Sequence, residues 1–171
     1  MTEQLDNTAE KVRGIHLAEI FPVMSEVFEN NGSFLLTITG TSMYPTILGN
    51  RDRVLLVRAP DQLKKYDLPL YRRDNGAFVL HRIVRVEKDG TYTCCGDHQW
   101  LKERGLRQDQ MIAVVQELER KGKRFSADNP QYRAWVRLWT FLFPMRHLLF
   151  WLQAQLKKVI RPFRKTTPKE G

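Results

Sequence analysis

The sequence predicts a mainly β fold, in which a compact antiparallel β domain lies between an N-terminal helix and a C-terminal amphipathic helical extension. Three observations support this prediction. The chain has 171 residues, 42% of them apolar, which is enough to bury one core. Short runs rich in β-branched and apolar residues recur between residues 33 and 119, separated by Gly, Asp, Asn and Pro. Apolar residues toward both ends of the chain instead recur at helical spacing.

The elements follow in this order along the chain. Residues 1–32 are predicted to contain a helix from residue 9 to 30, with a break near Pro22. Strands of the β domain, residues 33–119, are expected in the runs FLLTIT, RVLLV, AFVLHRIVRV, TYTCC and MIAVVQEL. Residues 120–129 are predicted to be a linker. Residues 130–171 are predicted to form basic, aromatic helices and a tail, with a kink or split at Pro144.

The net charge of +9 is concentrated at the C-terminus. Residues 1–39 hold two Lys or Arg against six Asp or Glu, whereas residues 126–171 hold nine against two. Such a tail favours a phosphate-bearing partner, either lipid or nucleic acid. The N-terminus has no basic region followed by an apolar core, so no signal peptide is predicted. The chain is therefore expected in the cytoplasm or at the cytoplasmic face of a membrane.

The aromatic C-terminal segment suits an anionic membrane surface. Charged residues interrupt its apolar run, which favours helices lying in the headgroup plane over a membrane span of about 20 apolar residues. The alternative is that these helices pack on the β domain and expose their basic residues to water. Under the membrane hypothesis, the candidate contacts are Trp135, Trp139, Arg146, Trp151, Lys157 and Lys158.

Ser42 lies between two strand-like runs, in a loop that holds Gly40, Pro45 and Gly49. By itself it has the pattern of an ordinary turn serine. Gly40, however, permits unusual backbone angles and the close approach of a substrate chain, and Met43 and Pro45 stiffen the far side of the loop. A rigid loop that presents one hydroxyl suits a nucleophile, provided that a base removes the proton.

Four blocks of the sequence resemble the signal peptidase I and LexA-like serine peptidase superfamily, most closely its histidine-type members of the endoplasmic-reticulum and archaeal kind. GTSMYPTI, leading into GNRDRVLLV, matches the Ser-Met pair followed by Pro, and KKYDLPLYRR matches the next turn and strand. VLHRIV matches the block that carries the base, and YTCCGDHQW matches the Gly-Asp block. The blocks cover roughly residues 33–115.

The resemblance implies a serine endopeptidase that acts on a peptide or protein. Ser42 is then the nucleophile, His81 the general base and Asp97 the acid that orients His81. Because histidine has an ordinary pKa of about 6.5, its neutral form is available at pH 7 to accept the serine proton. The backbone N–H of Ser42 is the candidate oxyanion donor, with the hydroxyl of Thr41 or Thr39 as a second candidate donor. His98 is the alternative base.

Two functions of other classes stay open. One is a DNA-associated regulator with a repressor-type serine domain, although the N-terminal helix is short and acidic for a helix-turn-helix module and no nucleic-acid partner is expected. The other is a noncatalytic protein-binding β domain. No metal or organic cofactor is expected, because the four histidines show no metal-ligand spacing.

Overall fold

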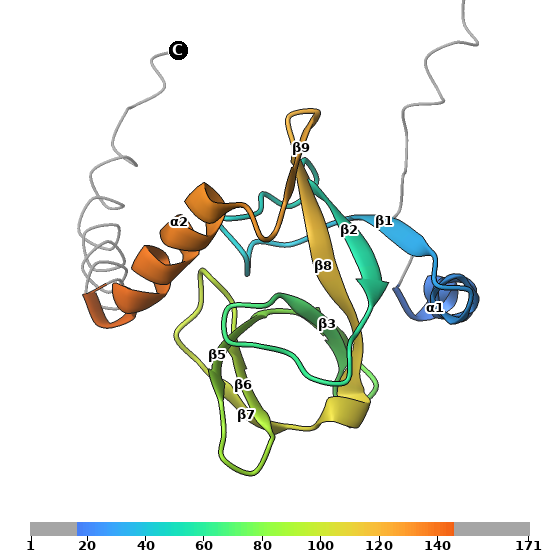
Figure 1. Cartoon of the computed structure of the whole chain (residues 1–171), viewed down its shortest axis with the longest axis horizontal. Coiled ribbons are helices and arrows are strands. Elements are labelled where there is room, and N and C mark those ends of the chain that lie inside the picture. The colour runs from blue at the N-terminus through green and yellow to red at the C-terminus, as the bar shows by residue number, and fades with distance from the viewer. Residues whose placement is uncertain (1–16, 146–171) are drawn as a thin grey trace, which may run out of the picture.

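Antiparallel strands make up most of the structure, a computed structural model that describes residues 17–145 (Figure 1). The larger sheet has the strand order β1-β2-β8-β3-β4, with β9 also paired to β8, and the smaller sheet has the order β5-β6-β7. The prediction of a mainly antiparallel β fold is therefore confirmed. The strands are β1 (Ser33–Thr37), β2 (Arg53–Arg58), β3 (Pro69–Arg72), β4 (Phe78–Leu80), β5 (Arg82–Val86), β6 (Tyr92–Cys95), β7 (Glu103–Leu106), β8 (Met111–Arg120) and β9 (Lys123–Ser126).

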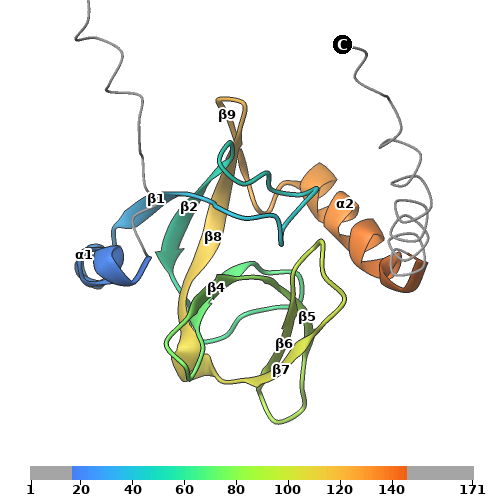
Figure 2. The same cartoon turned by 180° about the vertical axis from the view of Figure 1, so that it is seen from behind.

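The ten-residue strand β8 holds the larger sheet together. It pairs with β2 through Leu56↔Val115 and with β3 through Leu70↔Ala113. Below it, the strands from β3 to β7 curl round into a half-barrel, which Figure 2 shows from behind. Side chains from both sheets fill the interior of this curl.

The run AFVLHRIVRV, predicted as one strand, divides at His81. Leu80 ends β4, which pairs with β3 in the larger sheet, whereas Arg82 begins β5, which pairs with β6 in the smaller sheet. The chain therefore turns from one sheet into the other at His81. This corner buries the imidazole, which is 4% exposed.

Two helices lie at opposite ends of the molecule (Figure 1). Helix α1 (Leu17–Glu29) packs Met24 and Phe28 into the core of the larger sheet. The break predicted at Pro22 does not occur. Helix α1 continues through Pro22, which lies on its exposed side. Helix α2 (Pro130–Phe141) begins where the side chain of Asn129 accepts hydrogen bonds from two backbone N–H groups.

The segment 120–129, predicted as a linker, contains strand β9. Its polar and basic residues pair with β8 from Arg120↔Lys123 to Glu117↔Ser126. The turn between the strands, Lys121–Gly122, has positive φ angles of 51° and 76°, as two-residue hairpin turns require. The composition that resembled a linker therefore belongs to an exposed hairpin.

Candidate active site

The loop that carries Ser42 is closed at its base. Gly40 has a φ of 82°, and a Cβ built on Gly49 would lie only 2.1 Å from the Gly40 carbonyl oxygen, so the two glycine backbones touch. The N–H of Asn50 also donates to the carbonyl of Ile38 at 2.7 Å. These contacts fix both ends of the loop to strands β1 and β2.

The apolar residues of the loop anchor it in the core. Met43 and Ile47 are 2% and 1% exposed, whereas Thr41 is exposed and Ser42 and Pro45 are half-buried. Burial of an apolar side chain of this size stabilises by roughly 1.5–3 kcal/mol, so the loop is held by its own hydrophobic residues. Ser42 is thereby presented next to a buried anchor.

Asp52 braces the loop from within the protein. Its carboxylate accepts the Leu48 N–H at 2.9 Å and a bidentate pair of hydrogen bonds from Arg51. Burial raises the pKa of Asp52, but the hydrogen bonds from Arg51 and Leu48 outweigh it and hold the pKa below its ordinary value. Arg120 of β8 adds a hydrogen bond to the Thr46 carbonyl.

The backbone of Ser42 packs against residues Gly96–His98, which follow β6. The His98 N–H donates to the Ser42 carbonyl at 2.8 Å. A Cβ built on Gly96 would lie 2.7 Å from the same oxygen, so the close approach needs glycine at this position. The Tyr44 and His98 rings meet edge to face, with centroids 5.4 Å apart.

The ring of His81 is fixed through its Nδ1 atom. Glu103 Oε1 lies 3.2 Å from Nδ1, and the Tyr71 hydroxyl lies 3.3 Å from it. Arg73 in turn donates two hydrogen bonds to the Glu103 carboxylate, at 2.7 and 2.5 Å. A carboxylate on Nδ1 favours the tautomer with the proton on that atom, which leaves Nε2 as the proton acceptor.

The electrostatics keep His81 neutral and Glu103 charged. Burial lowers the pKa of His81; Glu103 opposes this shift and Arg73 adds to it, and the net pKa is below the ordinary value. Burial also raises the pKa of Glu103, but hydrogen bonds from Arg73 and Tyr71 outweigh it and lower the pKa. A neutral imidazole beside a charged carboxylate is the resting state that a general base requires.

The carboxylate of Asp97 is engaged by Arg82. Arg82 Nε and Nη2 donate to its two oxygens at 2.9 and 2.7 Å, and the Arg82 side chain is only 1% exposed. The orienting role that the resemblance implies for Asp97 stays a prediction, and the geometry favours Glu103 for it. Asp97 instead fixes the segment Gly96–His98, which contacts the Ser42 carbonyl. Its effect on the pKa of His81 is a small rise.

Ser42 and His81 meet at the same segment. The register Arg82↔Cys95 brings His81 next to Gly96, and the Gly96 backbone touches the Ser42 carbonyl. Among the described residues, no hydrogen bond joins the Ser42 hydroxyl to the His81 ring.

Comparison with protein-family models, curated proteins and solved structures finds no match for this chain. The geometry of the site is therefore the evidence on which a function rests.

Glu103, Tyr71 and Arg73 are not among the site residues predicted from the sequence. They come from β7, β3 and the residue after β3, so only the curled sheet brings them to His81. A Glu in the polar run LKERGL carries no local signal of such a role. Of the candidate membrane contacts, Trp135 and Trp139 are on α2, and the others lie outside the described residues: Arg146, Trp151, Lys157 and Lys158.

Neither a metal site nor a membrane-spanning helix is found in the part of the chain that the structure describes. Within residues 17–145, no group of three or more His, Cys, Asp or Glu side chains is placed to hold a metal ion. Over the same residues, no helix has the length and apolar character needed to cross a bilayer.

Proposed function

We propose that this protein is a serine endopeptidase of the signal-peptidase-like kind, with Ser42 as nucleophile and His81 as general base. The observation that carries the proposal is the anchoring of His81 Nδ1 by the charged carboxylate of Glu103 at 3.2 Å, in a buried corner next to the serine loop. A carboxylate in this position orients the imidazole and stabilises the imidazolium that forms during attack.

The steps follow from these positions. Ser42 Oγ attacks the peptide carbonyl carbon while its proton moves to His81 Nε2. The resulting oxyanion is met by the Ser42 backbone N–H. His81 then passes the proton to the departing amine, which leaves an acyl-enzyme ester. A water molecule attacks this ester while His81 takes its proton; His81 then returns the proton to Ser42 Oγ as the bond from Oγ to the acyl carbon breaks, and the carboxylic acid product leaves. General-base assistance of this kind contributes about 10²- to 10⁴-fold in rate.

No hydrogen bond joins the Ser42 hydroxyl to the His81 ring among the described residues, so the proposed reaction requires the serine loop to bring the two side chains into contact. Hydrogen bonds of unliganded catalytic sites are often long and shorten when substrate binds. Beside the site is a pocket of about 330 Å³, lined by Arg73, His98, Gln99, Trp100, Leu101 and Glu103. Two of these lining residues also belong to the site, because Glu103 contacts His81 and His98 contacts the serine loop. The pocket is therefore suited to bind a substrate side chain near the scissile bond.

The experiment compares variants on a peptide library, with new N-termini identified by mass spectrometry. Ser42→Ala and His81→Gln are expected to remove cleavage, and circular dichroism shows whether each variant is folded. His98→Gln is the comparison variant, because it changes the other histidine beside the serine. It is expected to keep measurable activity, reduced by the change in the pocket that His98 lines. If His81→Gln keeps activity and His98→Gln loses it, His98 and not His81 is the general base.

A noncatalytic protein-binding domain is the second candidate. It is favoured by the same observation that calls for an adjustment of the loop, namely that no hydrogen bond joins Ser42 to His81 within the described residues. If the native chain and Ser42→Ala give identical sets of peptides, this second function replaces the first.

A further inference from the structure

Helix α2 has apolar residues on two sides, and only one side is covered. Val136 is 2% exposed, and Tyr132 packs against the core of the larger sheet. On the outer side of α2 and just past its end, apolar residues recur every three or four positions and stay exposed, at 40% for Trp135, 51% for Leu138, 79% for Phe141 and 60% for Met145. An apolar stripe of this kind on a helix surface marks a contact with another apolar phase or protein.

The loop between β6 and β7 adds to this surface. Leu101 is 75% exposed and Trp100 is 59% exposed. Two contacts hold the loop against α2: Trp139 Nε1 donates to the Asp97 carbonyl at 3.0 Å, and Lys102 Nζ lies 4.5 Å from the centre of the Phe143 ring. We call the exposed apolar residues of α2 and of this loop the docking face.

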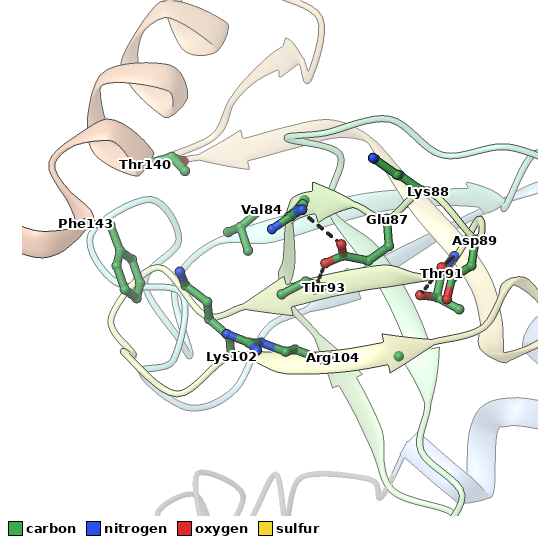
Figure 3. A pocket seen from close by; sticks show the side chains of 12 residues that line it. Val84, Glu87, Lys88, Asp89, Thr91, Thr93, Lys102, Arg104, Thr140 and Phe143 are labelled. Carbon is green, nitrogen blue, oxygen red and sulfur yellow. Dashed lines mark hydrogen bonds and ion pairs between the residues drawn. The ribbon is translucent and has the colours of Figure 1, made fainter.

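Positive charge surrounds the docking face. From residue 129 to 145 the chain has Arg133 and Arg137 but no acidic residue, and Arg133 is paired with Asp128 at 2.6 Å. A pocket of about 720 Å³ lies between the end of α2 and strands β5–β7, and Figure 3 shows Lys102 near Phe143, with Arg104 next to Lys102. The pocket contains four cations and two acids: Arg85, Lys88, Lys102, Arg104, Glu87 and Asp89.

The two acids of the pocket are already engaged. Glu87 pairs with Arg85 at 3.1 Å and accepts the Thr93 hydroxyl at 2.7 Å, and Asp89 accepts the Thr91 hydroxyl at 2.7 Å. The four cations of the pocket also outnumber its two acids, so this end of α2 has an excess of positive charge. Apolar and aromatic side chains ringed by Lys and Arg match the boundary of a bilayer that contains anionic lipid.

We propose that the docking face binds the surface of an anionic bilayer, with the apolar stripe at the acyl boundary and Lys102 and Arg104 among the headgroup phosphates. The loop of the docking face begins at Asp97 and His98, and His98 holds the Ser42 carbonyl. Docking therefore brings the serine loop close to the lipid surface. If the chain is the proposed endopeptidase, docking at the bilayer makes its substrate a membrane-proximal segment of a protein; this assignment rests on the proposed function.

The first test measures binding of the full chain by flotation with vesicles of phosphatidylcholine, with and without phosphatidylglycerol. Binding is expected only with the anionic lipid. Leu138→Ser/Phe141→Ser is expected to weaken it by about tenfold or more, because both side chains are exposed and their loss removes apolar contact with the lipid. Val23→Ser is the matched control, since Val23 is 58% exposed on α1 and lies outside the docking face.

Two results would overturn the proposal. One is equal binding by the native chain and the Leu138/Phe141 variant, which would place the lipid contact elsewhere. The other is a native chain that ignores both kinds of vesicle but changes from dimer to monomer in the variant, which would make the docking face a contact between two copies. Analytical ultracentrifugation separates this last case.

A second test separates the membrane proposal from the proposed function. Ser42→Ala is expected to bind vesicles as the native chain does, whatever the outcome of the peptidase assay. A peptide that the native chain cleaves is then tethered to anionic vesicles, and the Leu138/Phe141 variant is expected to lose cleavage of the tethered peptide while cleaving the free peptide normally. Equal loss on both peptides would refute the assignment of a membrane-proximal substrate.

Discussion

Replacement of Glu103 by Gln tests the central contact of the proposed site. Gln keeps the size of the side chain and one oxygen that accepts the Nδ1 proton, but it removes the charge and one of the two oxygens that accept hydrogen bonds from Arg73. Glu103 raises the pKa of His81, against the lowering effect of burial. Without the charge, the His81 pKa falls further below its ordinary value, and the imidazolium formed during attack loses its counterion.

The expected loss of rate follows from the distance between the two groups. Unit charges 3.2 Å apart, the distance from His81 Nδ1 to Glu103 Oε1, attract each other by about 5 kcal/mol at an effective dielectric constant of about 20. Arg73 on the same carboxylate and partial solvent access reduce this figure. We therefore expect kcat/KM to fall by about 10²- to 10⁴-fold, or roughly 3–5 kcal/mol.

The assay is a pH profile of kcat/KM for the native chain and for Glu103→Gln, on a peptide identified from the library. His81 must be neutral to act as a base, so activity is present above its pKa and lost below it. The acidic limb is expected below the ordinary histidine range in the native chain, and at still lower pH in the variant, with a lower plateau. A variant with the native plateau and the native limb would refute the role of Glu103 as the orienting acid.

Three further predictions follow from the same contacts. Asp97→Asn leaves the buried Arg82 guanidinium without its counterion, so the unfolding free energy in urea is expected to fall by about 3–5 kcal/mol, with a smaller movement of the acidic limb than in Glu103→Gln. Gly96→Ala places a Cβ 2.7 Å from the Ser42 carbonyl oxygen, which is expected to cost about 1–3 kcal/mol in thermal unfolding and to lower kcat/KM by displacing the serine. Because the His81 pKa is lowered by burial in the folded state, the unfolded chain binds this proton first, and the unfolding free energy is expected to fall as the pH drops below about 6.5. His81→Gln should flatten that part of the curve, and an unchanged slope would contradict the assignment.

The strands were predictable where a short apolar run is bounded by turn residues. The runs FLLTIT, RVLLV and MIAVVQEL bury apolar residues in the core of the larger sheet, and turn residues separate them. The hairpin of β8 and β9 was not predictable in this way, because β9 is mostly exposed and pairs through its backbone. Polar composition alone does not distinguish an exposed edge strand from a linker.

The corner at His81 and the identity of its partners required the three-dimensional structure. The run from Phe78 to Val86 contains neither Gly nor Pro, so nothing in it predicts that β4 and β5 belong to different sheets. Glu103 is 22 positions from His81, on a short strand with two exposed residues in its middle. The position of Asp97 in a Gly-Asp turn suggested a partner for His81. Arg82, the residue after His81, instead binds the Asp97 carboxylate, because its side chain is longer than that of His81 and its guanidinium matches both carboxylate oxygens.

The place of His81 between β4 and β5 has a mechanical consequence. Its backbone is continuous with one sheet on each side, while its ring is tethered to β3 and β7. A rotation of the smaller sheet relative to the larger one would therefore re-aim the imidazole and would also move Gly96 and His98, which contact the Ser42 carbonyl. A molecule that wedges the two sheets apart would thus disturb both proposed catalytic residues at once.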